Sequence, residues 1–270
     1  HIFHTNSEKI WKYINRFASF NHYVNRVKVS HKDKIYSFPI NLFTLYQLFG
    51  VKTPEEAKAC LAERKEPIEN PKNMEEWCLA NVGREIYETF IEGYSSKQWA
   101  RHPRELPASI IKRVPIRLTF DDNYFKDRYQ GIPIGGYTSI FEKMLDGIPV
   151  ELNTDFHLDR ETLLSKFDHV IFTGPIDSFF DYSLGHLEYR SLRFDHQLFN
   201  CSDFQGNAVI NHTESQIPYT RTYEHKHFDM SFSASKSAVT YEYPDKWEPS
   251  KIEIYPVNTD ENQSLFEKYQ

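Results

Sequence analysis

The hydrophobic pattern changes along the chain from helical spacing to alternation. In residues 8–20, apolar residues recur every three or four positions, which places them on one face of a helix. Residues 42–113 repeat this spacing, with Thr53 and Asn73 as polar N-caps and Gly50 as a stop signal. We expect helices at residues 8–20, 41–50, 53–65, 73–83, 84–94, 107–113, 138–147 and 161–167.

Elsewhere apolar and polar residues alternate, which predicts β-strands. Residues 23–30 and 35–40 alternate on either side of a polar turn and form a predicted hairpin, with Pro39 restricting the second strand to an edge or an end. Residues 169–175 are largely apolar and end in Gly-Pro, which is typical of a buried parallel strand next to a ligand. Further strands or extended segments are expected at residues 115–120, 129–137, 150–156, 189–195, 207–213, 220–228 and 238–243.

These elements together predict a mixed α/β (α+β) fold. Residues 42–113 would form a helical domain, and the alternating runs between Tyr189 and Tyr243 would form an antiparallel sheet.

Charge and cysteine usage narrow the function classes. The formal net charge of -6 argues against general nucleic-acid binding, which depends on a positive excess. No window approaches the roughly 18 apolar residues of a membrane span, and the first residues lack the profile of a signal peptide. Cys60, Cys78 and Cys201 lack metal-type spacing, which favours reduced thiols. We therefore expect a cytoplasmic protein that binds neither membrane nor nucleic acid.

The stretch from Gly93 to Tyr137 mixes aromatic residues with arginines and does not follow a core pattern. Flat rings can stack on a base or a sugar, and planar guanidinium groups match phosphate oxygens. Isolated arginines are often only surface charges, but Arg113 here, and Arg221 later in the chain, stand among aromatics and not among acids. The stretch predicts a ligand that has rings and phosphates, bound by residues from the set Tyr94, Trp99, Arg101, Arg113, Arg117, Tyr124, Phe125, Arg128 and Tyr129.

Two histidine clusters are weaker candidates. His1 and His4 form an HxxH pair, but no further ligand follows at a metal-binding spacing, so we expect no metal site. In residues 224–228, strand alternation would place Glu224, Lys226 and Phe228 on one face and the two histidines on the other. A solvated strand face is the alternative to an acid–base role for these histidines. The chain contains no GxSxG, GK[ST] or GxGxxG motif.

Nine segments of the chain resemble the UDP-galactopyranose mutase family, in that family's order and spacing. They are HIFHTN, GYSSKQW, ELPASIIKRVPIR, DDNYFKDRYQGIP, TGPID, YRSL, FQGNAVIN, IPYTRTYEHKHF and IYPVN. The resemblance covers essentially all 270 residues.

The resemblance implies an isomerase that interconverts UDP-galactopyranose and UDP-galactofuranose with reduced FAD. In this family N5 of the reduced flavin attacks the anomeric carbon, UDP leaves, and the sugar closes again in the other ring size. No net redox change occurs, and the galactofuranose serves cell-wall polysaccharide biosynthesis. A pyrophosphate leaving group needs cationic partners, which arginines supply.

The resemblance also implies roles for individual residues. Arg113 and Arg221 match the pyrophosphate clamps and are the predicted catalytic residues. Substrate-binding positions are matched by Asn25, Tyr94, Ser95, Trp99, Tyr124, Phe125, Asn211 and Tyr255, with Trp99 on a mobile segment that closes the site. Flavin-contact positions are matched by His1, Ile2, Thr173 and Gly174. Whether the protein forms a homodimer is left open.

The resemblance assigns domains as well. Residues 1–25 and 134–188 match pieces of a Rossmann-like FAD domain, residues 42–113 the helical substrate domain, and residues 26–41, 114–133 and 189–270 the sheet domain. The family's N-terminal GxGxxG segment and its C-terminal Gly-Arg and Tyr-x-Asp segment have no match in these residues. We therefore expect the 270 residues alone neither to retain FAD nor to turn over. The alternatives are a non-catalytic nucleotide-sugar binding fragment and a flavin oxidoreductase of the amine-oxidase kind.

Overall fold

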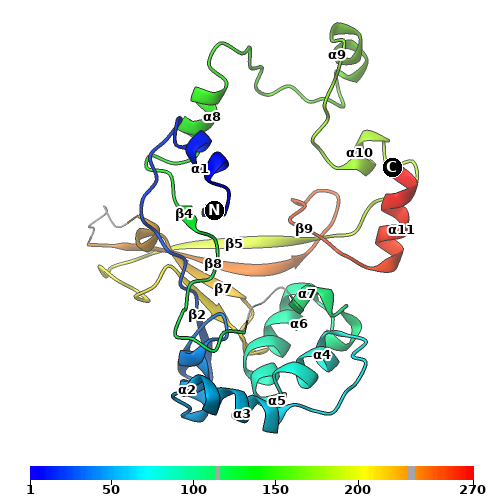
Figure 1. Ribbon diagram of the computed structural model, residues 1–270. Coiled ribbons are helices and arrows are strands. Elements are labelled where there is room, and N and C mark those ends of the chain that lie inside the picture. The colour runs from blue at the N-terminus through cyan, green and yellow to red at the C-terminus, as the bar shows by residue number, and fades with distance from the viewer. Residues whose placement is uncertain (113–115, 230–234) are drawn as a thin grey trace. The chain divides into compact units, whose positions relative to one another are not determined.

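The computed structural model describes residues 1–112, 116–229 and 235–270, which form two compact units. The larger unit comprises His1–Gly136 and Leu192–Lys246, and the smaller unit comprises Tyr137–Ser191 and Trp247–Gln270. Helices and strands occur in both (Figure 1). The predicted mixed α/β fold class is confirmed.

Polar caps start the helices of the larger unit where the sequence predicts them. The side chains of Ser7, Asn41, Thr53 and Asn73 each accept a backbone N–H from the first turn of the helix that follows, which satisfies donors that have no partner within the helix. Gly50 ends its helix at a φ of 74°, in the left-handed region that favours glycine. The four helices are α1 (Glu8–Ile14), α2 (Leu42–Phe49), α3 (Pro54–Arg64) and α4 (Met74–Asn81).

A longer helical stretch follows and changes its winding midway. It begins as α5 (Arg84–Ile86), passes through a π-helical segment η1 (Tyr87–Glu92) and ends as α6 (Gly93–Trp99). Short π-helical segments within α-helices are frequent at functional sites. The 3₁₀ turn η2 (Pro103–Glu105) and α7 (Ser109–Lys112) complete the helical region.

The main sheet runs in the order β3-β2-β6-β7-β8-β5-β9. As predicted, β2 and β3 form a hairpin with the Pro39 side at the sheet edge, and β6, β7 and β8 pair antiparallel. The contact between β2 and β6 is parallel. The strands are β2 (Lys28–His31), β3 (Lys34–Ser37), β5 (Tyr189–Phe199), β6 (Val209–His212), β7 (Arg221–Glu224), β8 (Ser237–Lys246) and β9 (Tyr255–Pro256).

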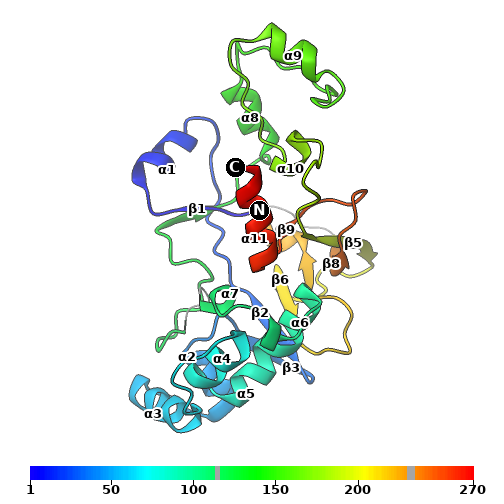
Figure 2. The ribbon, with the colours of Figure 1, turned by 90° about the vertical axis from the view of Figure 1, so that its right-hand side faces the viewer.

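Helix α2 packs against β3 and η1 packs against β2, and the helical region lies beside β2 in both views of the larger unit (Figures 1 and 2). Tyr36 of β3 contacts Phe90 of η1 edge-on, with ring centroids 5.3 Å apart. Tyr36, Val29 and Phe90 are buried, so this contact is part of the apolar core between the sheet and the helices. A separate two-stranded sheet pairs β1 (Phe3–Thr5) with β4 (Tyr129–Gly131).

The smaller unit contains short helices together with β9 and the first residues of β5. Tyr269 at the end of α11 ties its turns together, since the hydroxyl accepts the N–H of Leu184 and donates to the carbonyl of Gly185. Buried Asp177 accepts the N–H of Leu187 in the same way. The helices are α8 (Thr138–Met144), α9 (Arg160–Lys166), α10 (Ile176–Phe179) and α11 (Asp260–Tyr269).

Three predicted strand segments are wrong, and the fourth, residues 220–228, is a strand only at residues 221–224. Residues 150–156 and 169–175 form no strand, and Ile171 is 89% exposed, because no described strand pairs with them. A strand was also predicted at residues 115–120, but residues 116–120 are irregular. The backbone N–H of Arg117 donates to the carbonyl of Ile40, which does not belong to a strand. Residues 225–228 form a 3₁₀ turn, η3, so the predicted alternation of faces there does not occur.

Candidate active site

The candidate site is built on a row of side chains across the sheet of the larger unit. Asn211 on β6, Arg221 on β7 and Glu242 on β8 are register partners. Residues directly opposite in antiparallel strands project to the same face, so the three side chains share it. Asn211 is buried, and its Oδ1 has no hydrogen-bond partner among the described residues. The row thus presents a guanidinium group and an unsatisfied amide oxygen on one face.

Arg221 is held by an acid and by tyrosines. Its Nη1 lies 3.5 Å from Oε2 of Glu242 and donates to the Tyr223 hydroxyl at 3.3 Å. The Tyr223 hydroxyl in turn donates to Glu242. Burial works against the charge, but Tyr94, Tyr223 and Glu242 raise the pKa of Arg221 well above its ordinary value. Burial also raises the pKa of Tyr223. The site therefore keeps a fixed cation and a neutral hydroxyl donor at any physiological pH.

Helix α6 brings three predicted residues to this region. The ring of Tyr94 lies beneath the Arg221 guanidinium, 5.7 Å from centroid to Cζ, which is within cation–π range. Ser95 and Trp99 on the same helix are buried. A Cβ on Gly93 would lie 2.1 Å from the carbonyl oxygen of Thr213, so only glycine permits this approach of helix to loop. The close packing places Tyr94 next to Arg221.

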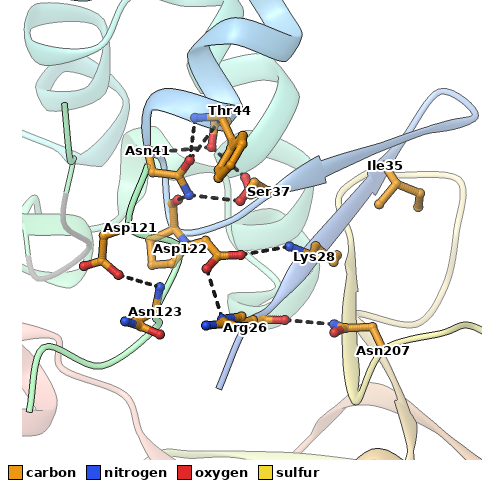
Figure 3. A network of polar contacts seen from close by, with 12 residues as sticks. Arg26, Lys28, Ile35, Ser37, Asn41, Thr44, Asp121, Asp122, Asn123 and Asn207 are labelled. Atoms are coloured by element: carbon orange, nitrogen blue, oxygen red, sulfur yellow. Dashed lines mark hydrogen bonds and ion pairs between the residues drawn. The ribbon is translucent and has the colours of Figure 1, made fainter. Parts of the chain in front are cut away.

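A loop anchored by ion pairs presents Tyr124 and Phe125. The Asp122 carboxylate lies 3.2 Å from Nε of Arg26 and 3.2 Å from Nζ of Lys28, and both contacts are drawn in Figure 3. Arg117, which is buried, donates to the carbonyl oxygens of Asp121 and Asn123. These contacts fix the loop against the start of β2.

Three predicted substrate residues meet at this loop. The N–H of Tyr124 donates to the carbonyl of Asn25 at 2.7 Å, and the amide oxygen of Asn25 accepts from Tyr23 at 3.2 Å. Phe125 stacks on His4 with ring centroids 3.7 Å apart. His4 lies on β1, so the loop contacts the N-terminal segment that carries the predicted flavin residues His1 and Ile2.

A cavity of about 410 Å³ opens beside Phe125. Among its lining residues are Arg117, Asn123, Lys126 and Gln130. Nε and Nη2 of Arg117 and Oδ1 of Asn123 are buried without a hydrogen-bond partner among the described residues. Polar groups in this state are costly unless a ligand or water satisfies them.

The structure does not unite all of the predicted residues. Tyr255, Thr173 and Gly174 belong to the smaller unit, where Tyr255 pairs with Arg190 across β9 and β5. Arg113 lies outside the described residues.

Sequence reasoning missed three residues of the site: Tyr223, Glu242 and Lys97. Glu242 is 4% exposed, and its signal was an acidic residue on the inward face of an alternating strand. Lys97 lies on α6 between Tyr94 and Trp99, and the sequence carried no signal for its partners.

Asp203, Glu224 and His227 bring potential metal-ligand atoms within 4.8 Å of one another. The Lys226 ammonium already contacts Asp203 at 2.8 Å and lies 3.8 Å from Glu224. Glu224 also accepts the N–H groups of Phe204 and Gln205. The chain itself therefore supplies a cation and hydrogen-bond donors to this cluster.

Comparison with known proteins found similar sequences and a similar fold. A family model described as UDP-galactopyranose mutase matches residues 89–270. A probable UDP-galactopyranose mutase of Klebsiella pneumoniae is 41% identical over 273 residues, covering 100% of this chain and 70% of its own length. A dTDP-fucopyranose mutase of Escherichia coli is 37% identical and covers 100% of this chain and 74% of its own length. A crystal structure of reduced UDP-galactopyranose mutase shares the fold, with a TM-score of 0.64 at 14% identity over 99% of this chain and 75% of that one.

Proposed function

The chain belongs to the UDP-galactopyranose mutase family, and on that premise we propose that it binds UDP-galactopyranose and takes part in its isomerisation to UDP-galactofuranose. The observation that carries the proposal is the placement of Arg221 in the sheet, with Asn211 beside it in register and Tyr94 beneath it. A permanent cation on a rigid strand can stabilise the charge that develops on a departing pyrophosphate.

The other residues divide into phosphate and ring partners. Arg113 is proposed as the second pyrophosphate cation, and the hydroxyls of Tyr124 and Tyr255 as phosphate donors. Phe125 and Trp99 offer rings to the uracil base or ribose. The unsatisfied Oδ1 of Asn211 is an acceptor for a sugar hydroxyl, and Asn25 and Ser95 complete the predicted pocket.

Tyr223 and Glu242 hold the Arg221 side chain in place. Glu242 accepts hydrogen bonds from Tyr223 and from the Thr220 hydroxyl, so its two oxygens are fixed. This arrangement orients Arg221, because a guanidinium group on a strand otherwise has several rotamers available. Arg221 is thereby held ready for the phosphate before the ligand arrives, which lowers the entropic cost of binding.

FAD is the proposed cofactor, held by His1, Ile2, Thr173 and Gly174. His1, Thr173 and Gly174 are exposed and Ile2 is half-buried, which fits residues that contact a ligand and not a core. Reduced flavin, when bound, would supply the nucleophile for the anomeric carbon. His4, which stacks on Phe125, lies two residues after Ile2 in the chain.

Among the described residues, no helix has both the length and the apolar character needed to cross a bilayer. We propose a cytoplasmic location, because the three cysteines are free thiols and two of them are buried. A homodimer is compatible with this proposal and is not required by it.

The test uses the full-length protein with FAD, with and without dithionite, and follows the sugar products by chromatography. Interconversion of UDP-galactopyranose and UDP-galactofuranose only with reduced flavin is the expected result. dTDP-fucopyranose is the comparison substrate, since the Escherichia coli relative carries that name. Net oxidation of the sugar would favour the oxidoreductase alternative, and nucleotide binding without turnover would favour the binding-module alternative.

Arg221→Ala should lose most of the turnover in this assay, because it removes a contact to the leaving group. Arg16→Ala is the matched control, since Arg16 is exposed just beyond the end of α1 and its guanidinium stacks on the rings of Tyr13 and Phe17. Near-native turnover in Arg221→Ala would contradict the proposed role.

A further inference from the structure

Lys97 on α6 makes an unusual set of contacts. Its ammonium nitrogen lies 2.8–3.0 Å from four backbone carbonyl oxygens, those of His212, Glu214, Ile217 and Tyr219. His212 is the last residue of β6, and the other three residues lie in the segment that joins β6 to β7. An ammonium group has three N–H donors, so at least one of them is shared between two oxygens.

These contacts gather a loop around one charge. Carbonyl oxygens that converge on a point repel one another unless a cation lies between them, and hydrogen bonds from a charged donor are about twice as strong as neutral ones. The same loop is also packed against the helix backbone at Gly93, where a side chain could not fit. Helix α6 and residues 213–220 are therefore joined twice, once by packing and once by the ammonium.

We call this connection between α6 and residues 213–220 the junction. Each of the two segments lies close in sequence to a residue predicted to contact the nucleotide. On the helix, Tyr94 lies one turn before Lys97. On the loop, Tyr219 precedes Arg221 by two residues. Tyr94 and Arg221 are the cation–π pair of the site, so Lys97 bridges the two segments whose separation sets that contact.

We propose that Lys97 is a positioning residue that fixes the position of Tyr94 relative to Arg221, so that both can contact the phosphates of the nucleotide sugar. The inference rests on the proposed function, because it presumes a nucleotide at Arg221. Lys97 does not touch the ligand; it fixes the distance between two groups that do. Small displacements of such groups can cost up to about a hundredfold in rate or affinity.

The surroundings of Lys97 also give the inference a pH signature. Burial lowers the pKa of Lys97 to about 8, and Glu214 acts in the opposite direction. Burial and Lys97 lower the pKa of His212 to about 4, and burial raises that of Tyr219. Among these neighbours, Lys97 is the group whose charge changes between pH 7 and 9. Its ammonium, and with it the junction, is present below pH 8 and lost as the pH rises through 8.

The experiment measures UDP affinity by calorimetry on the full-length protein, for wild type, Lys97→Met and Lys97→Arg. Met keeps the length of the side chain and removes the donors. We expect Lys97→Met to weaken UDP binding at pH 7 by about tenfold or more, Lys97→Arg to recover part of the loss, and the wild-type affinity to fall between pH 7 and 9 while that of Lys97→Met stays flat. Lys58→Met, on exposed Lys58 of α3, is the control and should bind like wild type.

Thermal unfolding of the same variants separates positioning from mere stability. A Lys97→Met protein that melts lower but binds UDP with wild-type affinity well below its melting temperature would overturn the inference. If Lys97→Met is too unstable to purify, the wild-type protein alone tests the inference. A wild-type UDP affinity that is constant from pH 7 to 9 overturns it. A wild-type protein that does not bind UDP at pH 7 refutes the proposed function itself, which is a different outcome from wild-type binding that Lys97→Met leaves unchanged.

Discussion

Removing Arg221 should destabilise the protein through Glu242, in addition to its effect on turnover. The Glu242 side chain is 5% exposed and the Arg221 side chain 25% exposed, and they lie 3.5 Å apart. Removing one partner of a fully buried ion pair costs about 3–5 kcal/mol, since the other charge is left without compensation. Because Arg221 is partly exposed and Glu242 keeps bonds from Tyr223 and Thr220, we expect about 2–3 kcal/mol for Arg221→Ala.

A double-mutant cycle in urea at pH 7 tests this number. The proteins are wild type, Arg221→Ala, Glu242→Gln and the double variant, and each free energy of unfolding is read from its urea midpoint and slope. The double variant should recover about 1–2 kcal/mol relative to the sum of the single changes, since it no longer contains an uncompensated buried charge. Its UDP affinity should stay low, because the phosphate cation is still missing.

Strict additivity of the two single changes would refute the reasoning, since it would mean that the ion pair carries no coupling energy. A loss below about 0.5 kcal/mol for Arg221→Ala, the range of ordinary surface changes, would refute it as well. Arg16→Ala serves as the control and should fall within that range.

Three further predictions follow from buried groups of the larger unit. Gly93→Ala should lower the free energy of unfolding by about 1–3 kcal/mol or more, because the new methyl group would lie 2.1 Å from the Thr213 carbonyl oxygen. Thermal melting measures the loss, with Ser96→Ala on the same helix as the control. Equal melting temperatures for the two variants would contradict the close approach of helix and loop. Burial alone would raise the pKa of Glu224, but bonds from Ser237 and from two backbone N–H groups lower it on balance. The contribution of the Glu224 carboxylate to stability is therefore complete above the unfolded pKa of roughly 4.3 and is lost as the pH falls below that value. In urea titrations at acid pH, the free energy of unfolding of Glu224→Gln should fall less steeply with pH than that of wild type. The same pH dependence in both proteins would contradict this prediction. In the folded protein, Cys201 should react first with a thiol reagent at pH 8, because the other two cysteines are buried and have raised pKa values, that of Cys78 being about 12; a fast phase that survives Cys201→Ser would contradict this.

Local chemistry explains why most of the elements could be predicted. The caps at Thr53 and Asn73 and the stop at Gly50 act within a few residues, so the chain alone specifies them. The hairpin of β2 and β3 is equally local, with Lys32 and Asp33 both at positive φ in its turn. Strands that need distant partners were less predictable, and residues 169–175 are apolar yet unpaired in the described structure.

The sequence by itself determined the family and the fold class, and it predicted the residue types of the candidate site. Arg221, Tyr94 and Asn211 were identified from their motifs, and an arginine among aromatics favours a ligand with phosphates and rings wherever it lies. What only the tertiary structure decided is how these residues are held. Glu242 pairs with Arg221 from another strand, and Lys97 binds four carbonyls that are 115 to 122 residues away in sequence. The physical reason is that hydrogen bonds and charges act over a few ångströms of space, and register and packing bring such groups together without leaving a local pattern in the chain.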